Sequence, residues 1–306
     1  MSNMLLIIDI SHDSVTVSDF DMIRFRPVSI EHYSLMDFYD INSILDHHLR
    51  QGVTFVPEAC CIVCDAINAG EWVIPSHNPQ MRLSINKLKT QTGIKKICFL
   101  SPAEALSFSA LVREASGIQH LTGSENLTGE GIKFTVETRD RFNCSLLRQN
   151  SGRWQASRIV CNEPVITPDD TAITGFIHHY GIDALLNERG LVLLYGYFCA
   201  RNDRQADYLT YRDVLMNFTG QKQQERKDAI NAYFNLLSRF FSQIQERTSV
   251  KAQDMAFIIH TTQPNLFAVN FRQYVAGLSD NNPAYSVYLH SSDSPRLYGA
   301  AEWASH

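Results

Sequence analysis

Residues 60–112 read CCIVCDAINAGEWVIPSHNPQMRLSINKLKTQTGIKKICFLSPAEALSFSALV. The stretch has two apolar runs of strand length, Ala59–Ala66 and Lys96–Leu100, with a helical segment, Ser84–Gln91, between them. Pro102 follows the second run and is well placed to open a further helix, because proline is tolerated in a first helical turn. Short apolar runs that alternate with helices predict strands buried between helical layers, which is an α/β fold.

The same alternation extends over the rest of the chain. The clearest helix, Lys222–Arg247, has its apolar residues at spacings of i, i+3, i+4 and i+7, which places them on one face. Residues 116–130 are rich in Gly, Ser, Thr and Asn and are predicted to form a loop. Further strands are predicted at Met4–Asp9, Ser14–Phe20, Trp72–Ile74, Lys133–Val136, Cys144–Arg148, Met255–His260 and Tyr285–Leu289. Further helices are predicted at Asn42–Leu49, Thr171–Tyr180, Lys222–Arg247 (the clearest) and Arg296–Ala304.

Composition and charge narrow the classes of function. The chain has 306 residues, enough for a large core or two domains, and its formal net charge is −5. No basic stripe interleaved with aromatic residues is present, so we expect no nucleic-acid partner. No apolar stretch approaches the ~20 residues that cross a bilayer. The apolar run within Met1–Ile10 is too short for a signal peptide. We therefore expect a cytoplasmic protein with no membrane contact.

The cysteines do not indicate a disulfide framework or a metal site. Their number, seven, is odd and their spacing is irregular. Cys61 and Cys64 have the spacing of a zinc pair, but they lie in a predicted strand. Residues three apart on a strand point to opposite faces, so these two cannot hold one ion. We expect no metal site in the chain.

Three stretches in the same order resemble the bacterial glucokinases, members of the sugar kinase/actin-like ATPase superfamily. They are Cys60–Val112, Arg153–Pro168 followed by the GLVLLY of Gly190–Tyr195, and the SPRLYGAAEW of residues 294–303. The resemblance implies two actin-like (ribonuclease H-like) α/β domains with a cleft between them, the hexokinase/glucokinase architecture. It implies a small domain of residues 1–103 plus 291–306 and a large domain of residues 104–290.

The resemblance also implies two glycine-rich phosphate loops, and neither is present. Glycines serve there because backbone N–H groups must approach phosphate oxygens closely. At the first loop Asp9 remains, but Ser11, His12 and Asp13 follow it in place of Gly-Gly-Thr. Asp9 is thus a phosphate-loop remnant or a simple turn residue. The second loop, residues 137–142, has no glycine, and its two arginines either contact an anion or are solvated.

The catalytic aspartate of the family is also replaced. It would follow the strand Lys96–Leu100 and accept the proton of the sugar hydroxyl group. Ser101 and Pro102 occupy that position. Ser101 with Glu104, three residues later, matches a capping box, which explains the serine without catalysis. We therefore assign no catalytic residue.

The resemblance implies a sugar-holding segment at Ile159–Glu163, where Val160 replaces a glutamate and Glu163 a histidine. A further family glutamate falls near Asp183, and Asn78 matches a sugar-contacting asparagine. Asn78, Glu163 and Asp183 are thus vestigial substrate-binding residues. The Gly-Gly of the adenosine side is replaced within residues 260–263, which read HTTQ.

These substitutions predict a glucokinase-like pseudoenzyme, a regulatory or protein-interaction module that does not phosphorylate glucose and needs no cofactor. Its partner would be an unidentified protein, and a homodimer is possible. The aromatic residues of Tyr195–Asp213 are either interface anchors or core residues. The alternatives are a divergent ATP-dependent glucokinase, for which ATP and magnesium are expected, and a sugar sensor without turnover.

Overall fold

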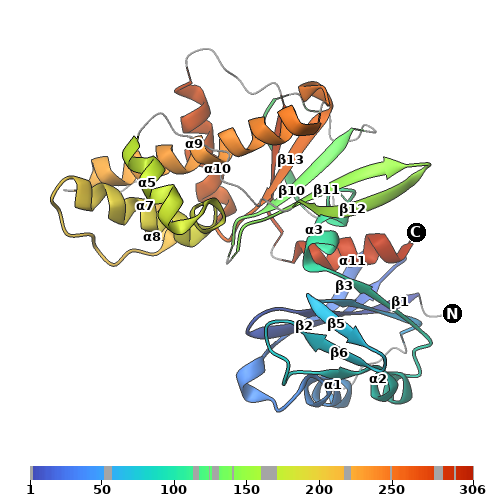
Figure 1. Cartoon of the computed structure of the whole chain (residues 1–306). Coiled ribbons are helices and arrows are strands. Elements are labelled where there is room, and N and C mark those ends of the chain that lie inside the picture. Colours follow the sequence, from blue (N-terminus) through green and yellow to red (C-terminus); the bar gives the residue numbers. More distant parts are fainter. Residues whose placement is uncertain are drawn as a thin grey trace. The chain divides into compact units, whose positions relative to one another are not determined.

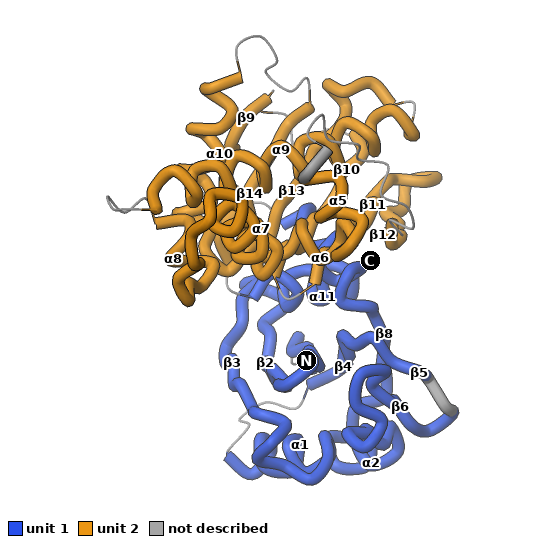
Figure 2. The backbone as a smooth tube through the Cα atoms, turned by 60° about the vertical axis from the view of Figure 1, so that its left-hand side comes forward, with its two compact units in different colours: residues 1–116, 294–306 blue, residues 117–293 orange. Residues whose placement is uncertain are grey.

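The computed structural model describes residues 3–51, 57–112, 117–123, 125, 131–139, 141–159, 171–216, 222–248, 250–278, 285–292 and 294–305. The chain divides into two compact units, which Figure 2 shows in different colours. Unit 1 is residues 1–116 with 294–306, and unit 2 is residues 117–293. Unit 1 includes the helix that begins at Pro102, which the domain boundary predicted at residue 103 assigned to the large domain.

Unit 1 is built on a five-stranded sheet with helices on both faces (Figure 1). The strand order is β3-β2-β1-β4-β8; β1 pairs with β4, and β4 with β8, in parallel. The strands are β1 (Met4–Ile10), β2 (Ser14–Asp21), β3 (Arg26–Ser34), β4 (Ala59–Val63) and β8 (Lys96–Leu100). The helices are η1 (Leu35–Asp37), α1 (Ile41–Arg50), α2 (Ile85–Thr92), α3 (Pro102–Ser109) and α11 (Pro295–Ser305). A small sheet joins β5 (Ala66–Ala69), β6 (Trp72–Pro75) and β7 (Leu83–Ser84).

Alternate residues of the central strands supply the two cores of unit 1. Leu6 and Ile8 pack with residues of α1 and α2, whereas Leu5 and Ile7 pack with residues of α3 and α11. This is the period of two that a strand buried on both faces requires. Cys64 lies with the first core and Cys61 with the second, so the prediction that these two thiols point to opposite faces is confirmed.

Unit 2 is built on a six-stranded sheet in the order β12-β11-β10-β13-β14-β9. One face packs against helices, and its core includes Phe134, Phe257, Phe234 and Phe271. The strands are β9 (Ile118–Thr122), β10 (Ile132–Glu137), β11 (Asn143–Asn150), β12 (Arg153–Ile159), β13 (Met255–His260) and β14 (Ser286–His290). The helices are α5 (Thr171–Tyr180), α6 (Ile182–Leu185), α7 (Glu188–Arg201), α8 (Tyr211–Leu215), α9 (Gln223–Thr248), η2 (Ala252–Asp254) and α10 (Pro264–Ala276).

One predicted loop needs correction, and one alternative that the sequence left open can be decided. Residues 118–122 form β9 inside the predicted loop, because pairing with β14 outweighs their polar composition. Three aromatic residues of Tyr195–Asp213 belong to the core, because Tyr195, Phe198 and Tyr211 are buried. Tyr208 is fully exposed. Across the described residues, no helix is both long enough and apolar enough to cross a membrane.

Candidate functional site

The parallel strands of unit 1 place polar side chains at their carboxyl ends. Asp9 lies near the end of β1, and Ser101 directly follows β8. Ligand sites of α/β sheets form at this edge, because loops and helix N-termini converge there. The resemblance implied both positions, each at the end of a predicted strand.

Ser101 and Glu104 form the capping box that the sequence predicts. The Glu104 N–H donates to Ser101 Oγ at 3.2 Å, and the Ser101 N–H donates to Glu104 Oε2 at 2.8 Å. Ser101 Oγ also donates to Glu104 Oε2, again at 2.8 Å. The other oxygen, Oε1, accepts no hydrogen bond from any residue that the structure describes. One carboxylate oxygen therefore serves the helix, and the other is available at the end of β8.

Asp9 lies beside a cation that the sequence analysis did not single out. Arg296 Nη1 is 3.7 Å from Asp9 Oδ1, and both side chains are largely buried. Arg296 is in the first turn of α11. It lies in the stretch SPRLYGAAEW, at a position where the resemblance implies a glycine. A guanidinium group at a helix N-terminus is a group suited to phosphate oxygens. The replacement of glycine by arginine was the signal that could have identified it.

The first phosphate loop meets the loop that contains Asn78. The imidazole rings of His12 and His77 stack with centroids 5.3 Å apart and planes at 22°. Asn78 directly follows His77 and is half-buried. Its side chain takes no hydrogen bond from the described part of the chain. The structure thus brings together two positions that the resemblance assigned separately to phosphate and sugar.

In unit 2, Asp183 lies in the first turn of α6 and is exposed. Burial raises the pKa of its carboxyl group, and the charge of Arg158 partly opposes this rise. Glu163 lies outside the described residues. So does Asp140 of the second phosphate loop.

Glu188 is a further polar residue that the sequence analysis missed. Its carboxylate accepts hydrogen bonds from Thr261 Oγ1 at 2.9 Å and from Thr262 N and Oγ1, both at 2.6 Å. These two threonines stand where the resemblance implies the Gly-Gly of the adenosine side. The contact joins the first turn of α7 to the loop after β13, so a threonine pair held by a carboxylate replaces an open glycine turn.

The comparisons with known proteins agree with this fold. No family model matches the chain. The glucokinase of Photorhabdus laumondii is 23% identical over 222 residues, which cover 69% of this chain and 67% of that protein. The glucokinase of Pectobacterium atrosepticum is 20% identical over 251 residues, covering 78% and 76%.

Solved structures match over nearly the whole chain. A glucokinase from an Antarctic psychrotroph superposes with a TM-score of 0.76, at 12% identity, over 99% of both chains. A ROK-family glucokinase from Streptomyces griseus, in complex with glucose and AMPPNP, gives 0.60 at 12% identity over 98% of both. The predicted fold, the two-domain actin-like fold of the sugar kinases, is therefore confirmed.

The comparisons also correct one prediction. The sequence analysis expected a chain that is not an enzyme, because the motif residues are replaced. The relatives and the structural neighbours named above are glucokinases, which points to an enzyme and gives no support for inactivity. Replacement of the motif residues is a weak argument for loss of catalysis. Neighbouring side chains, such as those of Glu104 and Arg296, lie at the same sheet edge and carry groups of the kind that the motifs supply. The chain is therefore similar in sequence to two glucokinases, and it has the fold of the solved glucokinase structures.

Proposed function

We propose that the chain is a divergent ATP-dependent sugar kinase that transfers the γ-phosphoryl group of ATP to a hydroxyl group of a hexose. One observation carries the proposal. Two glucokinases match 69% and 78% of the chain in sequence, and a glucokinase structure matches 99% of it in fold. Glucose is the first sugar to test, because the relatives are named for it.

Glu104 is the candidate general base. A base must accept the proton of the sugar hydroxyl group as its oxygen attacks the phosphorus atom. Oε2 is engaged with Ser101 at 2.8 Å, which fixes the carboxylate, and Oε1 is available to the substrate. In the transfer the sugar oxygen bonds to phosphorus, the bond to the ADP oxygen breaks, and the proton passes to Glu104.

Asp9 and Arg296 are the candidate phosphate-side residues. Mg²⁺ is usually held by one or two carboxylates together with substrate phosphates and water. A single carboxylate such as Asp9 is sufficient for an ion that arrives with ATP. When bound, the ion would neutralise charge on the phosphates. Arg296, 3.7 Å from Asp9, would contact a phosphate oxygen directly.

Asn78 and Asp183 are the candidate sugar-side residues. Asn78 is half-buried and Asp183 is exposed, and both have side chains that can hydrogen-bond a hydroxyl group.

The base is tested with Glu104→Gln. Glutamine is accepted at the same position of a capping box, so helix α3 and the unfolding temperature should stay close to wild type. Loss of the base should lower kcat for hexose phosphorylation by about 10²- to 10⁴-fold. Ser101→Ala is the matched control, because it weakens the cap and leaves the carboxylate. A Glu104→Gln variant with wild-type kcat would exclude Glu104 as the base.

A further inference from the structure

The loop of residues 76–82, here called the Asn78 loop, is held at both ends. It connects β6 to β7. At its start the Ser76 N–H donates to the carbonyl oxygen of Asp65 at 2.8 Å. Inside it, the Asn78 N–H donates to Pro75 O at 3.2 Å, and the Met81 N–H donates to Asn78 O at 3.1 Å. The backbone around Asn78 is therefore ordered by its own turns.

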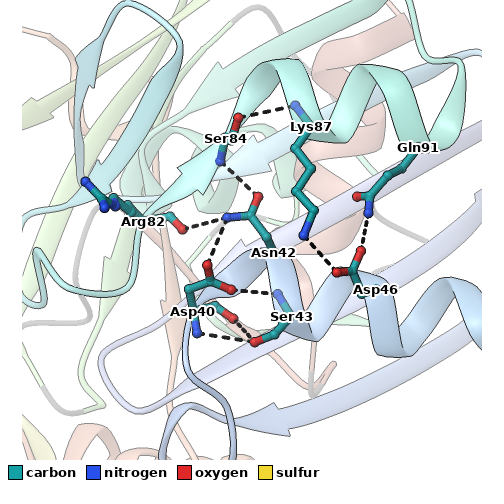
Figure 3. A network of polar contacts seen from close by, with 8 residues as sticks. All are labelled: Asp40, Asn42, Ser43, Asp46, Arg82, Ser84, Lys87 and Gln91. Atoms are coloured by element: carbon teal, nitrogen blue, oxygen red, sulfur yellow. Dashed lines mark hydrogen bonds and ion pairs between the residues drawn. The ribbon is translucent and has the colours of Figure 1, made fainter.

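The end of the loop is held by one buried side chain, Asn42 of α1 (Figure 3). Asn42 Nδ2 donates to the carbonyl oxygen of Arg82 at 3.3 Å, and Asn42 Oδ1 accepts from the Ser84 N–H at 3.0 Å. Nδ2 also donates to Asp40 Oδ2 at 3.3 Å. Asn42 is only 4% exposed, and its bond with the Ser84 N–H is buried, whereas its bonds with Arg82 O and Asp40 Oδ2 are partly buried.

The orientation of Asn42 is itself fixed. Asp40 is the N-cap of α1, and its Oδ1 accepts from the Ser43 N–H at 2.7 Å. Helix α1 is anchored in the core by the fully buried Ile41 and Ile44. The chain of contacts thus runs from the core through α1 and Asn42 to the carbonyl group four residues after Asn78.

We propose that Asn42 is a positioning residue for Asn78, and that it sets the affinity of the protein for a hexose. The inference rests on the proposed function, because Asn78 needs a sugar to hold. A buried asparagine suits the task, since one amide group offers a donor to Arg82 O and an acceptor to the Ser84 N–H. Without it, the Ser84 N–H loses a buried partner and the carbonyl group of Arg82 loses a partly buried one. The end of the loop is then held less firmly, by the pairing of β7 with β6.

A neighbouring contact supplies the control. Lys87 Nζ donates to Asp46 Oδ2 at 2.8 Å, and Gln91 also bonds to Asp46 (Figure 3). These contacts join α1 to α2 but do not touch the Asn78 loop. Asp46→Asn weakens the contacts of Asp46 with Lys87 and Gln91, which lie in a partly exposed place. It therefore alters the packing of α1 on α2 without altering the Asn78 loop.

The experiment measures glucose binding by titration calorimetry, which requires no turnover. Asn42→Ala should raise the Kd for glucose by about tenfold, because small displacements of positioning groups have effects of this size or larger. Asp46→Asn should leave the Kd within about twofold of wild type. If the alanine variant does not fold, Asn42→Ser takes its place, because the serine hydroxyl group retains one polar group in the buried site.

A double-mutant cycle separates positioning from loss of stability. If Asn42 acts through Asn78, then adding Asn42→Ala to Asn78→Ala should change the Kd little further. Equal glucose affinity in Asn42→Ala and wild type would overturn the inference, as would fully additive effects of the two substitutions.

The wild-type protein distinguishes this inference from the proposed function. If it binds glucose but transfers no phosphoryl group, the kinase proposal fails, and the Kd comparison still decides the role of Asn42. If it binds neither glucose nor any other hexose, the inference is overturned, because Asn78 then has no sugar to hold.

Discussion

Glu104 shows how one side chain can serve both structure and chemistry at the residue scale. Its Oε2 completes the cap of α3, and its Oε1 remains available at the end of β8. The cap fixes the carboxylate in place, which a base requires. The resemblance implies the family aspartate at Ser101 or Pro102, so the proposed base lies further along the chain, in the first turn of the helix.

Lys133 allows a pH prediction at the same scale. It is 3% exposed in β10, and its Nζ lies 4.5 Å from the centroid of the Trp154 ring. Burial lowers the pKa of Lys133 to about 8. The unfolded value is about 10.4, so between these values the unfolded chain binds more protons. The free energy of unfolding should therefore rise with pH in this window, by up to about 1.4 kcal/mol per pH unit.

Chemical denaturation of wild type and Lys133→Met between pH 7 and pH 10 checks this expectation. The methionine variant lacks the titration, so the difference between the two proteins should change in favour of wild type as pH rises above 8. A difference that is constant over the whole range would contradict a depressed pKa.

The residues also show what the sequence could predict. Asp9 and Ser101 were located because the resemblance implies functional residues at the ends of two strands, and each of those strands is an apolar run in the sequence. The contact of Glu188 with Thr261 and Thr262 could not be predicted, because 73 and 74 residues separate the partners and only the fold brings them together. The same holds for Arg296 beside Asp9, which depends on α11 returning to β1.

At the scale of the element, the close crossing of α3 and α11 in unit 1 depends on one glycine (Figure 1). A Cβ atom added at Gly299 would overlap the carbonyl oxygen of Ala105 and lie 2.8 Å from the Ser109 backbone nitrogen. Backbone atoms of a packed helix cannot move aside cheaply. Gly299→Ala should therefore lower the free energy of unfolding by at least about 2 kcal/mol.

Gly196, inside α7, is the matched control for this prediction. Nothing lies within 4 Å of a Cβ atom added there. Gly196→Ala should therefore stabilise the protein by about 0.5–1 kcal/mol, as alanine does in a helix interior. If thermal denaturation showed equal effects for both substitutions, the crossing would not depend on Gly299.

The elements differ in how well the sequence predicted them. Helix α9 and strands β1, β4, β8 and β13 were predicted closely, because each carries a continuous or regularly spaced apolar pattern. Strand β3 was missed, since most of its residues are exposed at the sheet edge and have no apolar period. The same reason applies to β12, which is at the edge of the sheet in unit 2.

At the scale of the whole molecule, the fold has been kept while the motif residues have changed. The order of the apolar segments was sufficient to predict the sugar-kinase fold, because packing depends on the pattern of burial rather than on particular loop residues. It was not sufficient to predict activity. Glu104 and Arg296 are not residues of the family motifs, whereas Asn78 matches a family asparagine, and the arrangement of all three required the structure.

The most direct test of the central claim is whether the wild-type protein forms a sugar phosphate. The protein would be incubated with Mg²⁺, ATP and glucose, and then with other hexoses in turn, and the products identified by mass spectrometry. We predict a hexose phosphate and an equal amount of ADP, formed only when sugar is present and strongly reduced in Glu104→Gln. A folded protein that forms no sugar phosphate from any hexose would contradict the account.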